Sequence, residues 1–479
     1  MMPHSYLTSC AGRLTRGLMR LNFRRGLMIA LSAASIGGCS NEILQPNYNS
    51  PTVDGLSKDP SGLQLAATGI LVTERGNYFP YVRDVTIFGR EGYYYFPTDN
   101  RFVTDYLIGS AGKLSSTGFA SGNWFGFFRN MRNATNLVSA ANSSGLGAAQ
   151  KAAARGFANT MRGLDLYYAI SLRDTLGTPV EILANPNDQA PFVTRDSVYK
   201  RITAVLDSAK ADLAAGGASF PFVLHSGFSG FDTPASFLKF NRAIAARVLA
   251  VRGSLECGNA CYTSALTAVS ESFASAAGGA ASRADLDVGV YSIYSTSSGD
   301  GLNSLSQAGD ANYLAHSSIV ADAQAKPDGT PDARLTAKVA PLKSPRSSPG
   351  GPTKGITATE GFIIYPSNVT PTPIMRNEEL LLIRAEANLK LGNAGAALID
   401  LNNVRDISGG LAPIATPTVA ALLYERRYSL LSEGFRWIDV RRFGLLSTLP
   451  LDLPNHFVAK VVPIPKAECD ARLVLPVGC

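Results

Sequence analysis

Apolar side chains recur at helical spacing in the C-terminal part of the chain. From residue 377 onward, one helix face is formed by Leu381, Leu382, Ala385 and Leu389. Gly392 follows this stripe, at the position where a left-handed residue commonly ends a helix. A second stripe begins at Ala397 after a very short turn and reaches Val404, so the pattern predicts an antiparallel helix pair similar to a tetratricopeptide unit.

A third helix is expected directly after this pair. Thr416 and Pro417 have the residue types of an N-cap and a first helical position. Tyr424, Tyr428 and Leu431 then continue an apolar stripe.

Helical faces are also expected in much of the preceding chain. The predicted helices lie at residues 63–73, after 123–136, at 151–182 with a break at 176–179, at 193–213 with a cap near Thr194, and at 237–251. Residues 78–106 show no helical period and are expected to form a ring-rich loop or short strand. Residues 278–372 are rich in Gly, Ser, Pro and Thr, which indicates an irregular, loop-rich subdomain. The chain is therefore predicted to be mainly α.

Charged residues interleave with large apolar ones at the end of the third helix. The residues concerned are Glu425, Arg426, Glu433, Arg436, Trp437, Asp439 and Arg442. Because charged groups are rarely buried unless they are paired, we expect the acids to meet arginines of the same segment around Trp437, as a structural ion network.

The N-terminal segment has the composition of a secretory leader. The first 38 residues contain five arginines and no acid, and an apolar run occupies residues 27–36, which predicts a signal peptide. The Asn-, Pro- and Ser-rich residues that follow indicate a tether. Since five positive charges of the formal +7 lie in the leader, the basic balance does not indicate nucleic-acid binding.

Beyond the leader and Cys39, the remaining cysteines form two local pairs. These are Cys257 with Cys261 and Cys469 with Cys479. In the oxidising compartment that a signal peptide implies, both pairs could form disulfides. A zinc site is the alternative, although no histidine lies near either pair in sequence.

Motifs of catalysis are missing from the sequence. The histidines after the leader, His225, His316 and His456, do not form an HExxH or H-x-H pattern. The segment 227–231 lacks the last glycine of a nucleophile elbow, and no P-loop occurs. We therefore expect no enzyme, no metal site and no cofactor.

Rings next to polar side chains indicate a ligand site. The face of an aromatic ring packs on the apolar surface of a sugar or peptide while neighbouring groups form hydrogen bonds. The candidate ligand-binding residues are Arg90, Tyr93, Tyr94, Tyr95, Trp124 and Tyr313. For each ring the alternative is ordinary core packing, above all for Trp124.

Four blocks resemble the C-terminal signature of the SusD/RagB family of outer-membrane nutrient-binding lipoproteins. In chain order they are LIRAEANLKLG, ALIDLNNVR, LYERRYSLLSEGFRWIDVRR and VVPIPKAE. The resemblance implies a SusD-like fold of tetratricopeptide-like helical hairpins with an irregular subdomain. The small residues before Cys39 are similar to a lipobox, which implies cleavage before Cys39 and its acylation.

The resemblance also implies a function. The protein is expected to be lipid-anchored in the outer membrane, facing the cell surface, and to bind an oligosaccharide or peptide without transforming it. Its expected partner is a TonB-dependent SusC-like transporter that receives the ligand. The alternative is a helical-repeat scaffold for envelope protein assembly that has no small ligand.

The expected organisation combines these features. A signal peptide at 1–38 and a lipid-anchored linker at 39–60 precede a single SusD-like domain at 61–479. Within this domain we expect an N-terminal helical part with aromatic loops at 61–277, the irregular subdomain at 278–372, and C-terminal helical repeats with a tail at 373–479.

Overall fold

The computed structural model of the chain describes residues 53–58, 61–185, 188–306, 312–348 and 356–479. The expected signal peptide, the lipidation site Cys39 and most of the linker lie outside the described residues. The described part of the linker forms helix α2 (Val53–Lys58).

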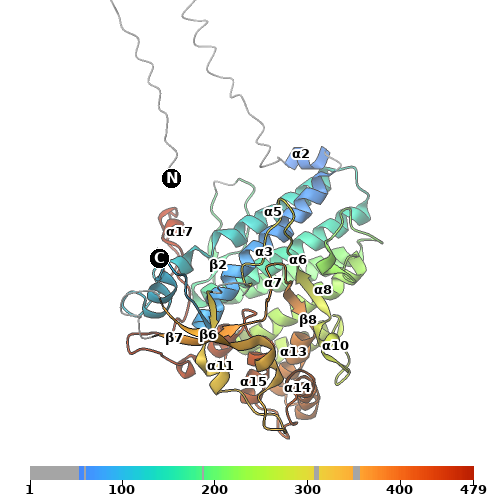
Figure 1. The fold of residues 1–479 in the computed structure, drawn as a ribbon. Helices are drawn as coiled ribbons and strands as arrows, with labels where there is room; N and C mark the ends of the chain where they lie inside the picture. The colour runs from blue at the N-terminus through green and yellow to red at the C-terminus, as the bar shows by residue number, and fades with distance from the viewer. Residues whose placement is uncertain (1–52, 59–60, 186–187, 307–311, 349–355) are drawn as a thin grey trace, which may run out of the picture. The chain divides into compact units, whose positions relative to one another are not determined.

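Long helices that pack on their neighbours in sequence form the N-terminal half (Figure 1). They are α3 (Gly62–Phe88), α5 (Phe125–Ser143), α6 (Ala148–Arg173), α7 (Arg195–Ala214), α8 (Pro234–Arg252) and α9 (Gly258–Ser270). The cap expected near Thr194 is present, since its side chain accepts a hydrogen bond from the N–H of Ser197. The prediction of a mainly α fold with stacked helical hairpins is confirmed.

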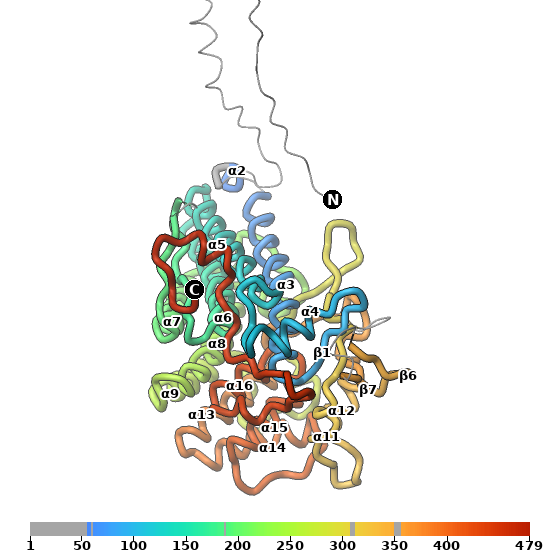
Figure 2. The backbone as a smooth tube through the Cα atoms, turned by 90° about the vertical axis from the view of Figure 1, so that its left-hand side faces the viewer, coloured from blue at the N-terminus to red at the C-terminus, as the bar shows by residue number. Residues whose placement is uncertain are grey.

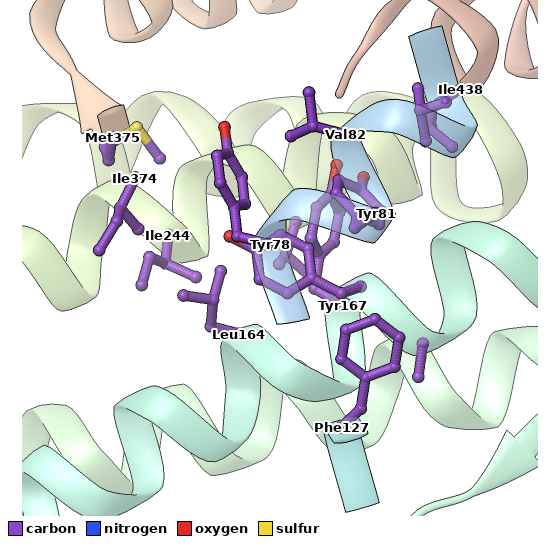
Figure 3. Packing of buried hydrophobic residues seen from close by; sticks show 14 of the residues in the cluster. Tyr78, Tyr81, Val82, Phe127, Leu164, Tyr167, Ile244, Ile374, Met375 and Ile438 are labelled. Atoms are coloured by element: carbon purple, nitrogen blue, oxygen red, sulfur yellow. The ribbon is translucent and has the colours of Figure 1, made fainter. Parts of the chain in front are cut away.

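Helix α3 extends well beyond the expected residues 63–73. The prediction of loop or strand from residue 78 is wrong as far as Phe88, because the helix continues through Pro80 to that residue. Tyr78 and Tyr81 pack against Leu164 and Tyr167 of α6, as Figure 3 shows. Nearly every side chain of this part of α3 is buried, so no polar face remains to produce a helical period.

The C-terminal helices form the expected hairpin and a shorter pair. They are α13 (Asn377–Lys390), α14 (Ala394–Gly409), α15 (Val419–Ser429) and α16 (Arg436–Arg442). Gly392 has φ +83° in the turn between α13 and α14, as its position after the apolar stripe predicted. The cap of α15 is a correction: Thr418, and not Thr416, accepts the N–H of Ala421 at 3.0 Å.

Residues 278–372 contain more regular structure than their composition indicates. β4 (Gly289–Ser292) pairs with β8 (Thr372–Arg376). A second, antiparallel sheet has the order β1-β5-β7-β6 and consists of β1 (Gly92–Tyr94), β5 (Tyr313–Ala315), β7 (Thr357–Phe362) and β6 (Val339–Ser347). Most strand partners lie far apart in sequence, and β1, β4 and β5 are very short, so local patterning gave no signal for them.

Both cysteine pairs form disulfides, which confirms the first of the two alternatives. Cys257, just before α9, is bonded to Cys261 in the first turn of that helix, and Cys469 is bonded to Cys479 in the C-terminal tail. The second bond holds the tail loop, whose Leu473, Val474 and Val477 side chains are largely exposed.

Buried ion pairs join the C-terminal helices to other parts of the fold. The principal pairs are Arg247 with Glu379, Arg334 with Asp332 and Glu425, Arg376 with Glu378 and Glu433, Arg405 with Glu425, Arg426 with Asp439, and Arg442 with Asp439 and Glu386. The side chains of these residues are almost wholly shielded from solvent. A structural network therefore exists at the expected place.

The partners differ in part from those expected. Asp439 does meet Arg426 and Arg442 within the segment. The expectation that Glu425 and Glu433 pair inside the segment is wrong, because their arginines come from α12 (Ala333–Lys338), β8 and α14.

The two remaining members of the expected network have other contacts. The indole N–H of Trp437 donates to the carbonyl oxygen of Ala459 at 2.7 Å. Arg436 forms no ion pair within the part of the chain that the structure describes.

Replacing a buried acid of this network should destabilise the fold. Glu425 binds Arg334 at 2.6 Å and Arg405 at 2.7 Å, so Glu425→Gln leaves buried guanidinium charge uncompensated. We expect the free energy of unfolding to fall by about 3 kcal/mol, measured by urea denaturation. Glu181→Gln is the control, because Glu181 makes its pairs at the surface and should cost less than about 1 kcal/mol. If the two variants lost the same free energy of unfolding, the buried pairs of Glu425 would stabilise the fold no more than surface pairs do.

A second prediction concerns pH. Glu91 follows α3 in a fully buried position, and burial raises the pKa of its carboxyl from 4.5 to about 8, although Arg436 and Arg427 act in the opposite direction. The folded protein thus retains a proton that the unfolded chain releases, so stability falls as the pH rises from about 4.5 to about 8.

The variant Glu91→Gln should flatten this dependence. The amide keeps the shape of the side chain and does not titrate, so the slope of unfolding free energy against pH should decrease by up to about 1.4 kcal/mol per pH unit. Urea midpoints measured between pH 5 and pH 8 test this. Burial raises the pKa of Glu74 to about 7, which leaves a slope of the same sign in both proteins. Parallel curves for the two proteins would contradict the assignment to Glu91.

Candidate functional site

Strand alternation divides the four consecutive rings that begin at Tyr93. Successive side chains of a strand point to opposite faces of the sheet. Tyr93 and Tyr95 are buried and stack on each other, with ring centroids 5.3 Å apart. Tyr94 and Phe96 lie on the other face, with centroids 6.4 Å apart and an interplanar angle of 14°. Phe96 is 40% exposed, so one pair of nearly parallel rings reaches the surface.

Three further rings extend this exposed pair into an aromatic platform. We use this name for Phe79, Tyr94, Phe96, Phe102 and Phe119. Their ring centroids are 4.7 Å apart for Tyr94 and Phe102, 5.3 Å for Phe102 and Phe119, and 6.3 Å for Phe79 and Tyr94. Phe102 is buried and supports its neighbours, while the other rings keep part of their surface accessible.

Two arginines contact the platform. The guanidinium of Arg83 lies 4.5 Å from the ring centroid of Phe102, and that of Arg101 lies 3.7 Å from the centroid of Phe119. Asp99 accepts hydrogen bonds from Arg101 at 2.6–3.1 Å, and these bonds lower the pKa of its carboxyl. The platform therefore offers ring faces next to charged donors and a carboxylate acceptor.

Helix α3 and strand β1 position these groups. Phe79 and Arg83 are four residues apart on α3 and therefore share one face of it. That face is directed at Tyr94 of β1, since Arg83 lies 5.8 Å from the centre of the Tyr94 ring. Burial raises the pKa of Tyr94, so its hydroxyl remains a proton donor at neutral pH.

The other predicted residues of this region are engaged inside the protein. Arg90 has φ +54° and donates hydrogen bonds to the carbonyl oxygens of Ile87, Pro450 and Phe457 at 2.7–3.1 Å. These bonds hold a left-handed residue that is costly for a side chain other than glycine. The hydroxyl of Tyr313 lies 2.8 Å from Ser432 Oγ. Of these residues, Tyr313 lies against a platform ring, with its centroid 6.4 Å from that of Tyr94. Contact of Arg90, Tyr93, Tyr95 and Tyr313 with a ligand stays a prediction.

Trp124 lies apart from the platform. Its indole stacks on Phe192 with a centroid distance of 5.7 Å and an interplanar angle of 6°, and its N–H donates to Glu468 at 3.3 Å. The residue lines a hollow of about 240 Å³ together with Phe125, which is 51% exposed. The structure thus does not bring all six predicted residues to one place.

A larger hollow, of about 770 Å³, adjoins that of Trp124. Its walls are residues 175–176, 188–194 and the tail segment 471–477. Most of this lining is aliphatic, and Phe192 is its only ring among the described residues. Flat, exposed rings are the feature that recognises a sugar, so we prefer the smaller aromatic platform to the larger hollow as the candidate site.

Several platform residues were absent from the sequence-based set. Phe79, Phe96, Phe102 and Phe119 of the platform, and the adjoining Arg83 and Arg101, were not in that set. The period of two from Tyr94 to Phe96 was a usable signal, because it places these rings on one strand face. Phe119 had no such signal, since it reaches the platform only through the tertiary fold.

Two further findings concern metal ligands and membrane-spanning helices in the described part of the chain. Within the described ranges, no group of three or more His, Cys, Asp and Glu side chains is arranged to hold a metal ion. In the same ranges, the helices are too short or too polar to cross a lipid bilayer.

Comparison with known proteins gives one family. Residues 353–469 match the model of the SusD family. No curated protein sequence matches the chain.

Solved structures share the fold at low sequence identity. A SusD superfamily protein from Bacteroides vulgatus is 15% identical with a TM-score of 0.65, over 88% of this chain and 99% of that one. Surface glycan-binding protein A from Bacteroides thetaiotaomicron, solved with laminarihexaose, is 14% identical with a TM-score of 0.63, over 87% of this chain and 99% of that one. The corresponding protein from Bacteroides uniformis is 16% identical with a TM-score of 0.64, and the alignment covers 87% and 99% of the two chains.

The helical hairpins, the matched residues 353–469 and the similarity of nearly the whole fold agree with the signature blocks of the sequence. Residues 353–469 therefore carry a match to the SusD family, and the chain has the fold of solved SusD superfamily proteins.

Proposed function

We propose that the protein binds a glycan at the cell surface and delivers it to a TonB-dependent SusC-like transporter. The observation that carries this proposal is the pair of nearly parallel rings of Tyr94 and Phe96 at the surface, with Arg101 and Asp99 beside them. A structure with the same fold was solved with laminarihexaose, which favours a glycan over a peptide.

The platform suits reversible capture. A pyranose ring stacks its C–H face on an aromatic ring, and its hydroxyl groups exchange hydrogen bonds with charged neighbours. Because the rings are only partly exposed and do not enclose a cavity among themselves, most of a long glycan would stay in solvent. Affinity of this kind permits release toward a transporter.

The protein is proposed to bind its ligand without transforming it. The platform has Asp99 as a nearby acid, and Arg101 keeps the pKa of that carboxyl low. An acid held in the ionised state cannot donate the proton that glycoside cleavage requires. The site therefore favours a receptor over a hydrolase.

Cellular location follows from the leader and Cys39. We propose that acylation of Cys39 anchors the protein in the outer membrane, facing the cell surface, and that residues after it act as a tether. A lipid anchor supplies attachment without a membrane-spanning helix. The scaffold alternative would keep this anchor and dispense with the glycan.

Removing a platform ring should weaken glycan binding. We expect Tyr94→Ala and Phe96→Ala each to raise the dissociation constant by about three- to ten-fold, because each deletes roughly 0.5–1.5 kcal/mol of ring contact. Isothermal titration with laminarin oligosaccharides and a panel of other glycans measures this.

The matched control for these variants is Phe125→Ala. Phe125 is an exposed ring in the hollow of Trp124, so its loss should leave binding unchanged if the platform is the site. If Phe125→Ala weakens binding and the platform variants do not, the ligand site belongs to the hollow of Trp124.

Delivery to a transporter predicts a stable association in the membrane. From detergent-solubilised outer membranes, the affinity-tagged lipoprotein should copurify with a TonB-dependent receptor. Cys39→Ala should remove the lipid and shift the protein from the membrane to the soluble fraction. Isolation of the acylated protein with other envelope proteins and without such a receptor would favour the scaffold alternative.

A further inference from the structure

Helices α15 and α16 enclose a small hollow that carries two guanidinium groups. The two helices lie close together on the side of the protein that Figure 2 shows. The hollow has a volume of about 200 Å³. Its lining consists of Ala420, Leu423, Tyr424, Arg427, Arg436, Val440, Leu445 and Thr448. None of these residues belongs to the aromatic platform or to the hollow of Trp124.

Arg436 has no carboxylate partner in this hollow. Its Nε atom is buried without a hydrogen bond, and no ion pair involves its guanidinium within the described part of the chain. Asp439, the nearest acid on α16, is already shared by Arg426 and Arg442. Burial, together with the positive charge of Arg427, lowers the pKa of Arg436.

A second acid near Arg436 is Glu91, which offsets the charge of Arg436 only in part. Burial raises the pKa of Glu91 to about 8, so this carboxyl is largely protonated at neutral pH. Arg436 therefore lies in a poorly solvated position where Glu91, Asp439 and Asp322 offset its charge only in part, and within the described residues none of them forms an ion pair with it. An unpaired buried charge is costly, and most of this cost disappears when an anion is bound.

Arg427 adds to the positive field. Its Nη1 donates to Asp322 Oδ2 at 2.7 Å and its Nη2 donates to Ser318 Oγ at 2.9 Å. Its Nε is buried and has no partner. Asp322 is 54% exposed in its side chain, so this acid lies at the rim; it forms an ion pair with Arg427 and acts on Arg436 only through its field.

Other buried arginines differ from Arg436. Arg334 and Arg442 each have two carboxylates, and Arg90 has three backbone carbonyls. Arg173 has no carboxylate, but it is wholly enclosed, lies over the ring of Trp124 and donates to the carbonyl of Ser121. Among these residues, Arg436 alone combines a missing partner with a position on an open hollow.

We propose that this hollow binds a small oxyanion, a carboxylate, sulfate or phosphate group, through the guanidinium fork of Arg436 beside Arg427. The planar fork presents parallel N–H donors whose spacing matches two oxygens of such a group. The volume of about 200 Å³ is large enough for a group of this size. The site is independent of glycan capture at the platform.

Titration of the purified protein with defined anions tests the proposal. Sodium sulfate, phosphate, acetate and glucuronate are added at constant ionic strength against chloride, and thermal unfolding and calorimetry report binding. A ligand of the folded state raises the unfolding temperature in a saturable way. If glucuronate binds more tightly than acetate, the natural ligand is an anionic sugar. If sulfate or phosphate binds more tightly than both, the natural ligand is a free ion or an esterified group.

Three variants locate the binding. Arg436→Gln should raise the dissociation constant for the anion at least about ten-fold, since it removes the charge-assisted fork. Asp322→Asn should lower this dissociation constant several-fold, because the carboxylate of Asp322, which competes with the anion for Arg427, is lost. Arg129→Gln, an exposed arginine of α5, is the matched control and should change nothing.

Folding of Arg436→Gln is measured without added anion. The variant should unfold at the same temperature as the original protein or higher, because it removes an unpaired buried charge. Arg436→Lys, which keeps the charge and loses the fork, should bind with intermediate strength. Identical titration curves for the original protein, Arg436→Gln and Asp322→Asn, or no saturable response beyond that to chloride, overturn the proposal.

Discussion

Buried pairing of arginine with carboxylate is the interaction on which the rest of the structure depends. Hydrophobic packing alone stacks helices without fixing which elements meet. Here Glu425 of α15 joins Arg334 of α12 to Arg405 of α14, and Glu386 of α13 joins Arg442 of α16. Removing one partner of such a pair leaves a buried charge uncompensated, so these pairs favour the arrangement of hairpins and strands in which both partners meet. The same requirement makes the unpaired Arg436 conspicuous.

The aromatic platform is a consequence of this arrangement. Helix α3 is held by packing against α6 on one side and against α16 on the other, where Ile438 lies near Tyr81 and Val82 (Figure 3). Its last turns therefore present Phe79 and Arg83 to β1, whose register is set by pairing with β5. A ring pair on a short strand would otherwise be mobile. The fold supplies the rigidity that a stacking surface needs to discriminate among ligands.

The aromatic platform and the hollow between α15 and α16 differ in how their charged groups are paired. At the platform, Arg101 and Asp99 neutralise each other and leave a surface with modest polarity beside exposed rings. Between α15 and α16, Arg436 has no such neutralising partner in the described residues. A neutral sugar suits the first surface, where rings and polar neighbours replace its contacts with water. An oxyanion suits the second, where a guanidinium charge offsets the desolvation of the anion.

The sequence by itself determined the helical hairpins, the two local cysteine pairs and the resemblance of the C-terminal blocks to one family, because each depends on residues close together in the chain. The stripe from Leu381 to Leu389, the turn at Gly392 and the cap at Thr194 all belong to this class. Tertiary structure alone decided that α3 continues to Phe88, since most side chains of its second half are buried and leave no polar face to reveal the helical period.

The same division holds for the candidate site and for the ion network. Alternation in β1 could have separated Tyr94 and Phe96 from Tyr93 and Tyr95, whereas the arrival of Phe119 and the partners of Glu425 and Glu433 depended on contacts between distant segments. Composition marks a side chain as able to stack or to pair. Only the folded chain determines which partner a side chain meets, because the partner depends on which distant segments are buried against each other.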